Sequence, residues 1–233
     1  MEVERAMVKV RAMRTLENAL RRYGFHRIAG VDEVGRGCLA GPVVAAAVVL
    51  DPGRYIPGIH DSKMVTALER ERLYDVITRK ALAWSVASAQ PTEIDVMNIH
   101  RASLEAMRRA VMTLAPLPDL VLVDAFRIPE LLMAQCGVVH GDRRCTGIAA
   151  ASIIAKVTRD REMLSHHAAD PRYGYDRHKG YATADHLAAV AQHGYSPLHR
   201  RSFRPPSLFD RIEDQETEAP TVNSTPPFGI RGN

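Results

Sequence analysis

The chain has 233 residues, 46% of them hydrophobic and 25% charged, which is the composition of a soluble globular protein with enough residues for a buried core. Its three cysteines show no C-x-x-C spacing, which argues against a disulfide framework or a zinc ribbon, and no apolar stretch approaches the roughly 20 residues of a membrane helix, so we predict a cytoplasmic protein with no membrane association. The formal net charge of +4 is compatible with a polyanionic partner, but mildly basic proteins of other kinds are equally common.

The first half of the chain predicts two helices and three strands. Apolar residues at helical spacing indicate a helix over residues 5–23. A short buried run around Val31 ends at Asp32 and Glu33, and residues 41–50 read as a second strand. The turn between these two runs contains glycine and proline, which favours a hairpin-like pair. A helix over 64–82 and a third strand over 83–89 follow.

The second half mixes helices with strands. A capping signal at 92–95 precedes a helix over 98–114, and Pro116 and Pro118 separate that helix from a fourth strand over 119–126. Residues 136–139 are a candidate fifth strand, and helices are expected over 146–165 and 183–193. This order of elements favours an α/β layered domain. The composition from about residue 207 onward, rich in Pro, Ser, Thr and acids, is typical of a disordered tail.

Four carboxylates lie close to the ends of predicted strands: Asp32, Glu33, Asp124 and Asp142. Side chains that are adjacent on a strand point to opposite faces, so Asp32 and Glu33 can meet only where the strand relaxes into a turn. Asp124 follows four apolar residues, where an acid is costly to bury unless it is paired or binds a cation. Asp142 could equally be a helix cap. If the four converge, their oxygens suit two Mg²⁺ or Mn²⁺ ions in phosphodiester hydrolysis.

Glycines and basic residues offer candidate contacts to a nucleic acid. Gly35, Arg36 and Gly37 follow the acid pair, so a backbone without side chains could approach a sugar and test for its 2′-hydroxyl, although an isolated G-x-G is most often a turn. Lys63 lies in a polar turn that could contact phosphate. Two further groups are a polar stripe on one helix (Ser152, Lys156, Arg159), for which a solvated face is the simpler interpretation, and a basic cluster with one ring (Arg177, His178, Lys179, Tyr181).

Taken together, these motifs resemble the bacterial type 2 ribonuclease H, ribonuclease HII. The resemblance runs from about residue 26 to 206 in unbroken order and rests on AGVDEVGRG (29–37), LAGPVVAAAV (39–48), DSK (61–63), LVDA (122–125), GD (141–142), AASIIAKVTRDR (150–161), HKGYAT (178–183) and HRRSF (199–203).

The resemblance implies an RNase H-like mixed five-stranded sheet flanked by helices, with a C-terminal helical extension. It divides the chain into an N-terminal helical extension (1–25), a catalytic domain (26–206) and a tail (207–233). The implied activity is endonucleolytic hydrolysis of RNA in RNA–DNA hybrids and 5′ of ribonucleotides embedded in duplex DNA, which leaves a 5′-phosphate and a 3′-hydroxyl. Its nucleic-acid partners are RNA–DNA hybrids and ribonucleotide-containing DNA duplexes, and its protein partners are left open.

Matched position by position, the resemblance gives each candidate residue a role. The metal ligands are Asp32, Glu33, Asp124 and Asp142; the ribose-recognition loop is Gly35, Arg36 and Gly37; the ring at the ribonucleotide–deoxyribonucleotide junction is Tyr181; and the phosphate contacts are Lys63, Ser152 and Lys156. Three positions depart from the usual family pattern. Cys38 stands where proline is usual, Ala125 where glycine is frequent, and His140 where lysine is common.

Two other hypotheses remain. A non-catalytic nucleic-acid-binding protein with an RNase H-like fold would usually have lost a carboxylate, and all four are present. A transposase-type nuclease acting on DNA would give no reason for the GRG sequence or for Tyr181. A substrate with its single ribose changed to deoxyribose separates this DNA nuclease from a ribonuclease.

Overall fold

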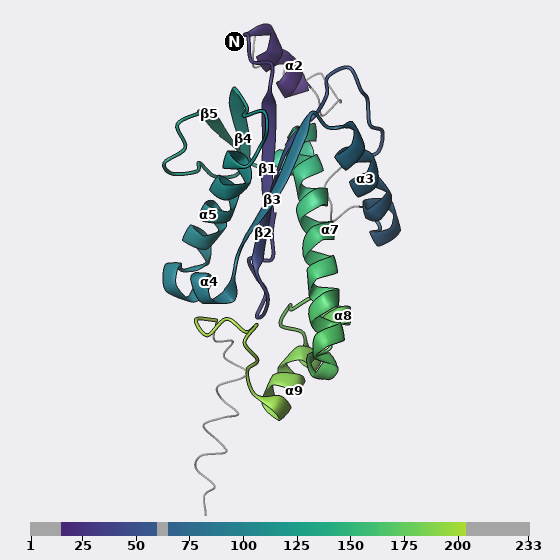
Figure 1. Ribbon diagram of the computed structural model, residues 1–233, viewed down its shortest axis with the longest axis vertical. Helices are drawn as coiled ribbons and strands as arrows, with labels where there is room; N and C mark the ends of the chain where they lie inside the picture. The colour runs from purple at the N-terminus through teal and green to yellow at the C-terminus, as the bar shows by residue number, and fades with distance from the viewer. Residues whose placement is uncertain (1–14, 60–64, 204–233) are drawn as a thin grey trace, which may run out of the picture. The chain divides into compact units, whose positions relative to one another are not determined.

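Five strands form one mixed sheet in the computed structural model, which describes residues 15–59 and 65–203 (Figure 1). Their order across the sheet is β3-β2-β1-β4-β5, and their bounds are Ile28–Val34 (β1), Val43–Val49 (β2), Ala83–Ala89 (β3), Leu120–Asp124 (β4) and Ala134–Val138 (β5). Strand β2 is antiparallel to both β1 and β3, whereas β4 is parallel to β1 and β5. The predicted α/β class, the five-stranded sheet and the β1–β2 hairpin are confirmed.

The helices differ from the prediction mainly in where they end. They are α2 (Thr15–Arg22), α3 (Ala67–Lys80), α4 (Pro91–Met97), α5 (Ile99–Met112), α6 (Gly141–Arg144), α7 (Thr146–Ala169), α8 (Tyr175–His178) and α9 (Ala184–His193), with a 3-10 turn, η2, at Pro171–Tyr173. The capping signal at 92–95 belongs to a separate helix, α4, because Asn98 has a φ of 69° and interrupts the helical path before α5. Helix α7 continues beyond the predicted end at 165.

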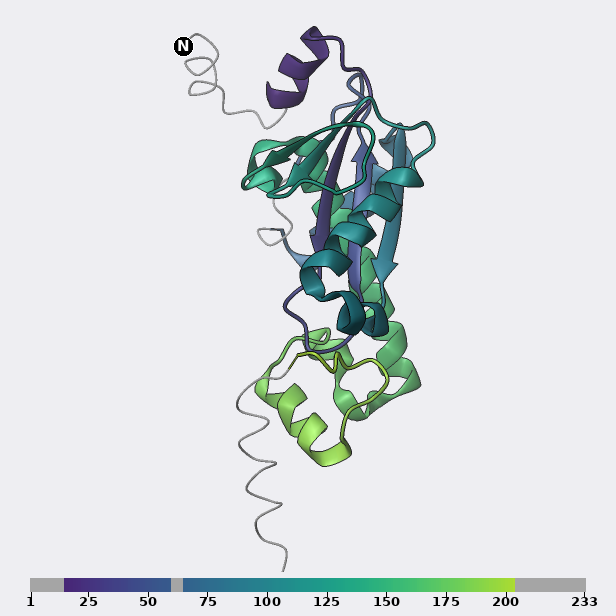
Figure 2. The same cartoon turned by 90° about the vertical axis from the view of Figure 1, so that its left-hand side faces the viewer.

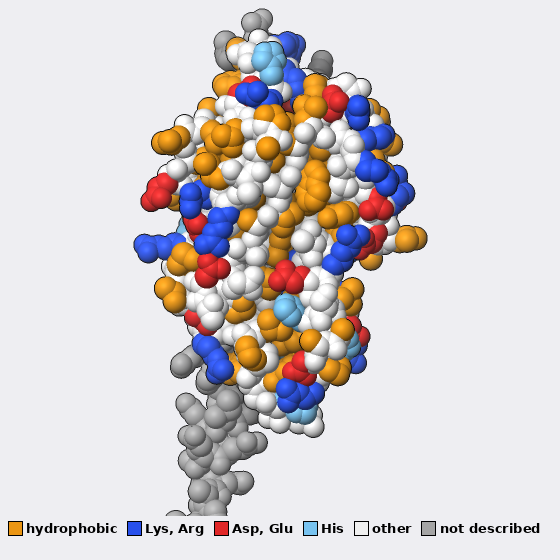
Figure 3. Space-filling view, viewed as in Figure 1, with side chains coloured by type: hydrophobic (Ala, Val, Ile, Leu, Met, Phe, Trp, Pro, Cys, Tyr) orange, Lys and Arg blue, Asp and Glu red, His pale blue; other side chains and the backbone are white. Residues whose placement is uncertain are grey.

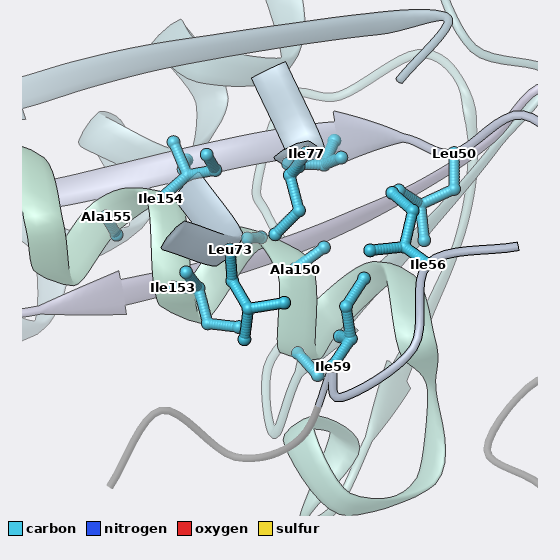
Figure 4. Close-up of a cluster of buried hydrophobic side chains, with 13 residues drawn as sticks. Leu50, Ile56, Ile59, Leu73, Ile77, Ala150, Ile153, Ile154 and Ala155 are labelled. Atoms are coloured by element: carbon cyan, nitrogen blue, oxygen red, sulfur yellow. The ribbon is translucent and has the colours of Figure 1, made fainter. Parts of the chain in front are cut away.

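Helices cover both faces of the sheet, with α4 and α5 on one side and α3 and α7 on the other (Figures 1 and 2). One core cluster lies between β2, α3 and α7, where Leu73 and Ile77 of α3 meet Ile153 and Ile154 of α7 (Figure 4). Complete burial of one such side chain contributes about 1.5–3 kcal/mol. This core fixes α7 against the sheet, and α7 carries several of the candidate site residues.

Two glycines set the distance between α7 and β1. A Cβ atom added to Gly30 would lie 2.0 Å from the backbone carbon of Gly147, which is shorter than any real contact. The backbones of β1 and of the first turn of α7 therefore touch, and no larger residue fits at position 30. This approach allows side chains further along α7 to reach the end of β1.

Helix α2 completes the start of α7. Glu17 is buried, and its Oε1 accepts a hydrogen bond of 3.0 Å from the backbone N–H of Gly147. Cys145, the N-cap residue of α7, makes no side-chain capping bond, so an acid 130 positions away in the sequence satisfies one of the free amide groups at this helix end. Leu16 and Leu20 pack beside it against a second core cluster. The helical extension predicted at 5–23 is thus helical from Thr15 onward, while residues 1–14 lie outside the described part.

None of the helices in the described part of the chain is both long and apolar enough to span a membrane. The cytoplasmic location and the three-part division of the chain stay predictions.

Replacing Glu17 by alanine is expected to lower the free energy of unfolding by about 1–2 kcal/mol, the range measured for the loss of a helix cap. The reason is that the Gly147 amide loses its acceptor and the positive end of α7 loses a negative charge. Equilibrium urea unfolding followed by circular dichroism measures the change.

The matched control is Asn18→Ala, on the exposed side of the same helix, for which a change within about 0.5 kcal/mol is expected. An equal loss in the two variants would show that Glu17 stabilises α2 itself rather than α7.

Candidate active site

Two neighbouring parallel strands bring the first carboxylates together. The register pairs Val31 of β1 with Val123 of β4, so the next residues, Asp32 and Asp124, lie at the same level of the sheet. Glu33 follows Asp32. The expectation that the strand ends at this acid pair is wrong, since β1 continues to Val34 and pairs both acids with β2.

The three acids repel one another. Burial raises the pKa of Asp32 well above its usual range, and the negative charges of Glu33 and Asp124 raise it further. The pKa of Glu33 is also raised, mainly by burial and partly by Asp124, while Arg36 acts in the opposite direction. Carboxylates whose ionised forms are this unfavourable gain from any nearby cation.

Each carboxylate also has a partner within the protein. Asp32 Oδ1 accepts from the backbone N–H of Glu33 at 2.8 Å, and its side chain is hydrogen-bonded to Ser152. Glu33 Oε1 accepts from Arg36 Nη1 at 3.3 Å.

The fourth predicted acid lies beside this group. Asp124 Oδ1 accepts a hydrogen bond of 2.7 Å from the N–H of Gly141, the residue that begins α6. Asp142 is the next residue and lies half-buried in the first turn of α6. The bond to Gly141 therefore links the segment that carries Asp142 to Asp124.

The described residues contain no group of three or more His, Cys, Asp or Glu side chains already arranged to hold a metal ion. The site nevertheless fits a divalent cation of the Mg²⁺ type, because the donors are hard oxygens and the charges on Asp32, Glu33 and Asp124 repel one another. The roles of the four acids as ligands stay predictions.

Ala125, one of the departures from the family pattern, has an unusual backbone. Its φ is 58°, in the left-handed region that glycine occupies freely and alanine occupies at a cost of about 1–2 kcal/mol. This turn ends β4 at Asp124, two residues before the predicted end at 126. The strained backbone directly after a candidate ligand keeps the acid at the end of the strand.

The glycine loop, residues 35–37, lies over two buried arginines. Gly35 has a φ of 94°, and a Cβ atom there would lie 2.3 Å from Arg159 Nε. The guanidinium of Arg159 donates to three backbone carbonyls, those of Pro42, Ala40 and Lys179. The guanidinium of Arg200 also donates to three, those of Gly41, Arg36 and Gly35. Both arginines are fully buried, at 0% exposure.

The Arg36 side chain turns toward the carboxylates. Besides its bond to Glu33, its guanidinium lies over the ring of Phe126, 4.9 Å from the ring centre. The exposed member of the loop is Gly37, with no atom within 4 Å of a Cβ built on it.

Tyr181 lies beside the glycine loop. Its backbone forms a bridge with Cys38, and the carbonyl of the preceding residue, Gly180, accepts from the N–H groups of Leu39 and Ala40. Tyr181 is 40% exposed, and Lys156 Nζ lies 5.9 Å from the centre of its ring. The predicted ring therefore faces solvent next to a cationic group and close to the predicted ribose-recognition loop.

Two sequence interpretations need revision, and a third is not tested. The stripe on α7 is not a solvated face, because Arg159 is fully buried and Ser152 is buried against Asp32. His178 does not belong to a basic cluster, since burial lowers its pKa and its Nε2 is bonded to the carbonyl of Tyr173. Lys63 lies outside the described residues.

The charged surface is also mixed rather than uniformly basic on the face shown in Figure 3, where acidic side chains lie among the lysines and arginines. Several exposed acids and bases of the described residues form ion pairs, for example Arg72 with Glu69 and Arg109 with Glu93. Such exposed pairs contribute little to stability.

Two buried histidines, whose role the sequence did not indicate, are linked by hydrogen bonds to the backbone of Tyr181. His199 Nδ1 accepts from the N–H of Ser196, so its Nε2 carries the proton and donates to His186 Nε2 at 3.1 Å. His186 Nδ1 in turn donates to the carbonyl of Tyr181 at 2.9 Å. Burial lowers the pKa of both histidines to about 4, so both are neutral at pH 7. Nothing in the sequence spacing distinguishes these histidines from exposed ones.

Comparison with known proteins gives one consistent result. The family model described as ribonuclease HII matches residues 29–205. The ribonuclease HII of Ralstonia nicotianae is 55% identical over 181 residues, which cover 76% of this chain and 77% of the relative. Among solved structures, ribonuclease H2 from Pyrococcus horikoshii OT3 has a TM-score of 0.67 at 26% identity and covers 83% of this chain and 100% of its own. Bst-RNase HIII in complex with Mn²⁺ has a TM-score of 0.65 over 86% of this chain and 73% of its own; at 19% identity this shows a common fold alone.

The buried histidines predict a loss of stability in acid. Their pKa is about 4 in the folded protein and about 6.5 in an unfolded chain, so only the unfolded chain takes up protons as the pH falls from about 6.5 toward 4. The free energy of unfolding is expected to fall across that window, by about 1.4 kcal/mol for each unit of pKa difference. Urea unfolding at a series of pH values measures the slope.

His199→Gln should reduce that slope, whereas His193→Gln, at an exposed position, should leave it unchanged. An unchanged slope in His199→Gln would assign the acid sensitivity to other groups.

Proposed function

Because this chain belongs to the ribonuclease HII family and is therefore a ribonuclease H, we propose that it hydrolyses the RNA strand of RNA–DNA hybrids and cuts 5′ of single ribonucleotides embedded in duplex DNA. The products are a 3′-hydroxyl and a 5′-phosphate. In a cell, such an incision begins the removal of misincorporated ribonucleotides.

The observation that carries the proposal is the group of repelling carboxylates in the last residues of β1 and at the end of β4. Asp32 is only 8% exposed, and both Glu33 and Asp124 raise its pKa. A purely structural role would pair such an acid with a cationic side chain, whereas a site for divalent cations leaves the repulsion for the ion to relieve. Asp142, on the segment bonded to Asp124, completes a set of four oxygen donors.

The four acids would hold two ions of Mg²⁺ or Mn²⁺. When bound, the ions would supply Lewis acidity toward the scissile phosphate and the attacking water. Ser152 would orient Asp32 through its hydrogen bond, and Arg36 would orient Glu33. Fixing ligand side chains in this way is the usual task of the residues around a metal site.

Recognition of ribose falls to the glycine loop and Tyr181. The exposed backbone at Gly37 allows a sugar to approach closely enough for its 2′-hydroxyl to form hydrogen bonds with main-chain groups. A deoxyribose has no 2′-hydroxyl and cannot form these bonds. The ring of Tyr181 would stack at the junction between ribonucleotide and deoxyribonucleotide, and Lys156 beside it would contact a phosphate. Lys63 is proposed as a second phosphate contact on its sequence position alone.

The second candidate function is a nucleic-acid-binding protein without catalysis. The retained carboxylates weigh against it, because a binder of a polyanion gains nothing from four acids beside its ligand. A nuclease acting on DNA alone would have no use for a loop that tests for a 2′-hydroxyl.

The decisive assay uses a DNA duplex with one ribonucleotide, incubated with Mg²⁺ or Mn²⁺ and, separately, with a chelator. Cleavage 5′ of the ribonucleotide is expected only with the metal, and the all-deoxy duplex should remain intact. Asp124→Asn should lower kcat by roughly 10²-fold or more, the order expected when one charge-stabilising group is lost. Asparagine can still accept the Gly141 hydrogen bond, so folding should be retained.

The control is Asp185→Asn, which replaces an exposed acid on α9 and should retain full activity. Cleavage by a folded Asp124→Asn protein at the unaltered rate would refute the metal role of this residue, and equal cutting of the all-deoxy duplex would favour the DNA nuclease.

The two glycines of the loop should respond differently to alanine. A Cβ at Gly37 meets no atom within 4 Å, so Gly37→Ala should leave thermal stability unchanged while the added methyl obstructs the sugar. We expect kcat/KM on the single-ribonucleotide duplex to fall by about 10-fold or more, since small misplacements at a reacting site are costly.

Gly35→Ala is the contrasting variant, because its Cβ would collide with Arg159 at 2.3 Å on a backbone with positive φ; it should lose stability. Full activity of Gly37→Ala would remove the loop from ribose recognition.

A further inference from the structure

Arg200 places its whole guanidinium against main-chain carbonyls. Its Nη2 donates to Gly35 O at 2.6 Å, its Nη1 to Arg36 O at 2.9 Å and its Nε to Gly41 O at 3.0 Å. The side chain is fully buried, at 0% exposure. A buried guanidinium is tolerated only where its donors find acceptors, so these carbonyls are strongly held toward Arg200.

Holding the carbonyls fixes the direction of the amides on the same peptide units. The only cis peptide bond in the described residues joins Ala115 to Pro116, so the peptide units of the glycine loop are trans. In a trans unit the N–H points opposite to the C=O. The carbonyls of Gly35 and Arg36 point inward to Arg200, and the N–H groups of Arg36 and Gly37 consequently point away from it, toward the side where Gly37 is exposed.

We propose that Arg200 is a positioning residue for ribose recognition: by binding the carbonyls of Gly35 and Arg36, it aims the amides of Arg36 and Gly37 at the incoming 2′-hydroxyl. The inference rests on the proposed function, since it gives the loop its task. A loop with two glycines has many accessible backbone conformations. Without Arg200 the loop would have to order these amides as the substrate binds, and that entropic cost would weaken recognition.

Arg159 provides a control of matched chemistry. It is equally buried and also donates to three carbonyls, but those belong to Pro42, Ala40 and Lys179. Arg159 therefore holds the segments beside the loop and not the two peptide units that present the amides. Loss of either guanidinium should destabilise the protein to a similar degree, while only loss of Arg200 should release the loop amides.

The test measures binding rather than cleavage, in the Asp124→Asn background with Mg²⁺. The dissociation constants are determined for a DNA duplex with one ribonucleotide and for the same duplex in all-deoxy form. The dissociation constant of the all-deoxy duplex divided by that of the ribonucleotide duplex reports how strongly the 2′-hydroxyl is recognised. Arg200→Lys is expected to lower this ratio by about five- to tenfold, the range for loss of one or two hydrogen bonds, and to change the affinity for the all-deoxy duplex by less than about twofold. Arg159→Lys should keep the ratio.

The outcomes separate the two proposals. If the parent protein binds both duplexes equally, the proposed function fails. If the parent prefers the ribonucleotide and a folded Arg200→Lys protein keeps that preference, the positioning role is overturned. An equal loss of preference in Arg159→Lys would also overturn it, because the effect would then come from loosened packing.

A second variant decides the question if Arg200→Lys does not fold. Asp95 accepts hydrogen bonds from the N–H groups of Arg201 and Ser202 and from the Ser202 hydroxyl. These bonds anchor the segment that carries Arg200. Asp95 is half-buried on α4, where asparagine is easily accommodated. Asp95→Asn should lower the ratio about two- to threefold, as expected for one weakened hydrogen bond, and an unchanged ratio would overturn the positioning role.

Discussion

The contact between the backbones of Gly30 and Gly147 is the constraint on which the arrangement of the site depends. It allows the first turn of α7 to lie directly on β1, and the straight path of the helix then determines where its later residues arrive. Ser152 reaches Asp32, and Arg159 reaches the underside of Gly35. One rigid helix, packed on the sheet by the core that it forms with α3, thus contacts both Asp32 and Gly35. The peptide units of the glycine loop are held by Arg200.

The site separates opposite charges over a short stretch of chain. Asp32 and Glu33 repel one another within the last residues of β1, while Arg159 and Arg200 are buried beneath the glycine loop that follows. The acids favour cations, and the arginines orient backbone groups rather than neutralise the acids. Burial lowers the pKa of Arg200 to about 10, which leaves its guanidinium charged at neutral pH and able to hold the carbonyls of the loop.

The sequence predicted what depends on local pattern and missed what depends on distant partners. Strand β3 was predicted with its observed bounds, and the hairpin followed from its turn residues. The parallel register that brings Asp32 level with Asp124 could not be read from spacing. Neither could the burial of Arg159 and His178, because each is stabilised by carbonyls supplied from other segments.

A long-range contact has a consequence for how the chain reaches its native state. Glu17 precedes Gly147 by 130 positions, so its acceptor oxygen can meet this amide only after the intervening chain has been made. Local helix formation can begin in α7 on its own, yet its first turn is completed by a partner 130 positions earlier in the chain. Contacts of such large sequence separation slow folding, because a long loop must close before they form. The first turn of α7 is therefore expected to become ordered later than the remainder of that helix.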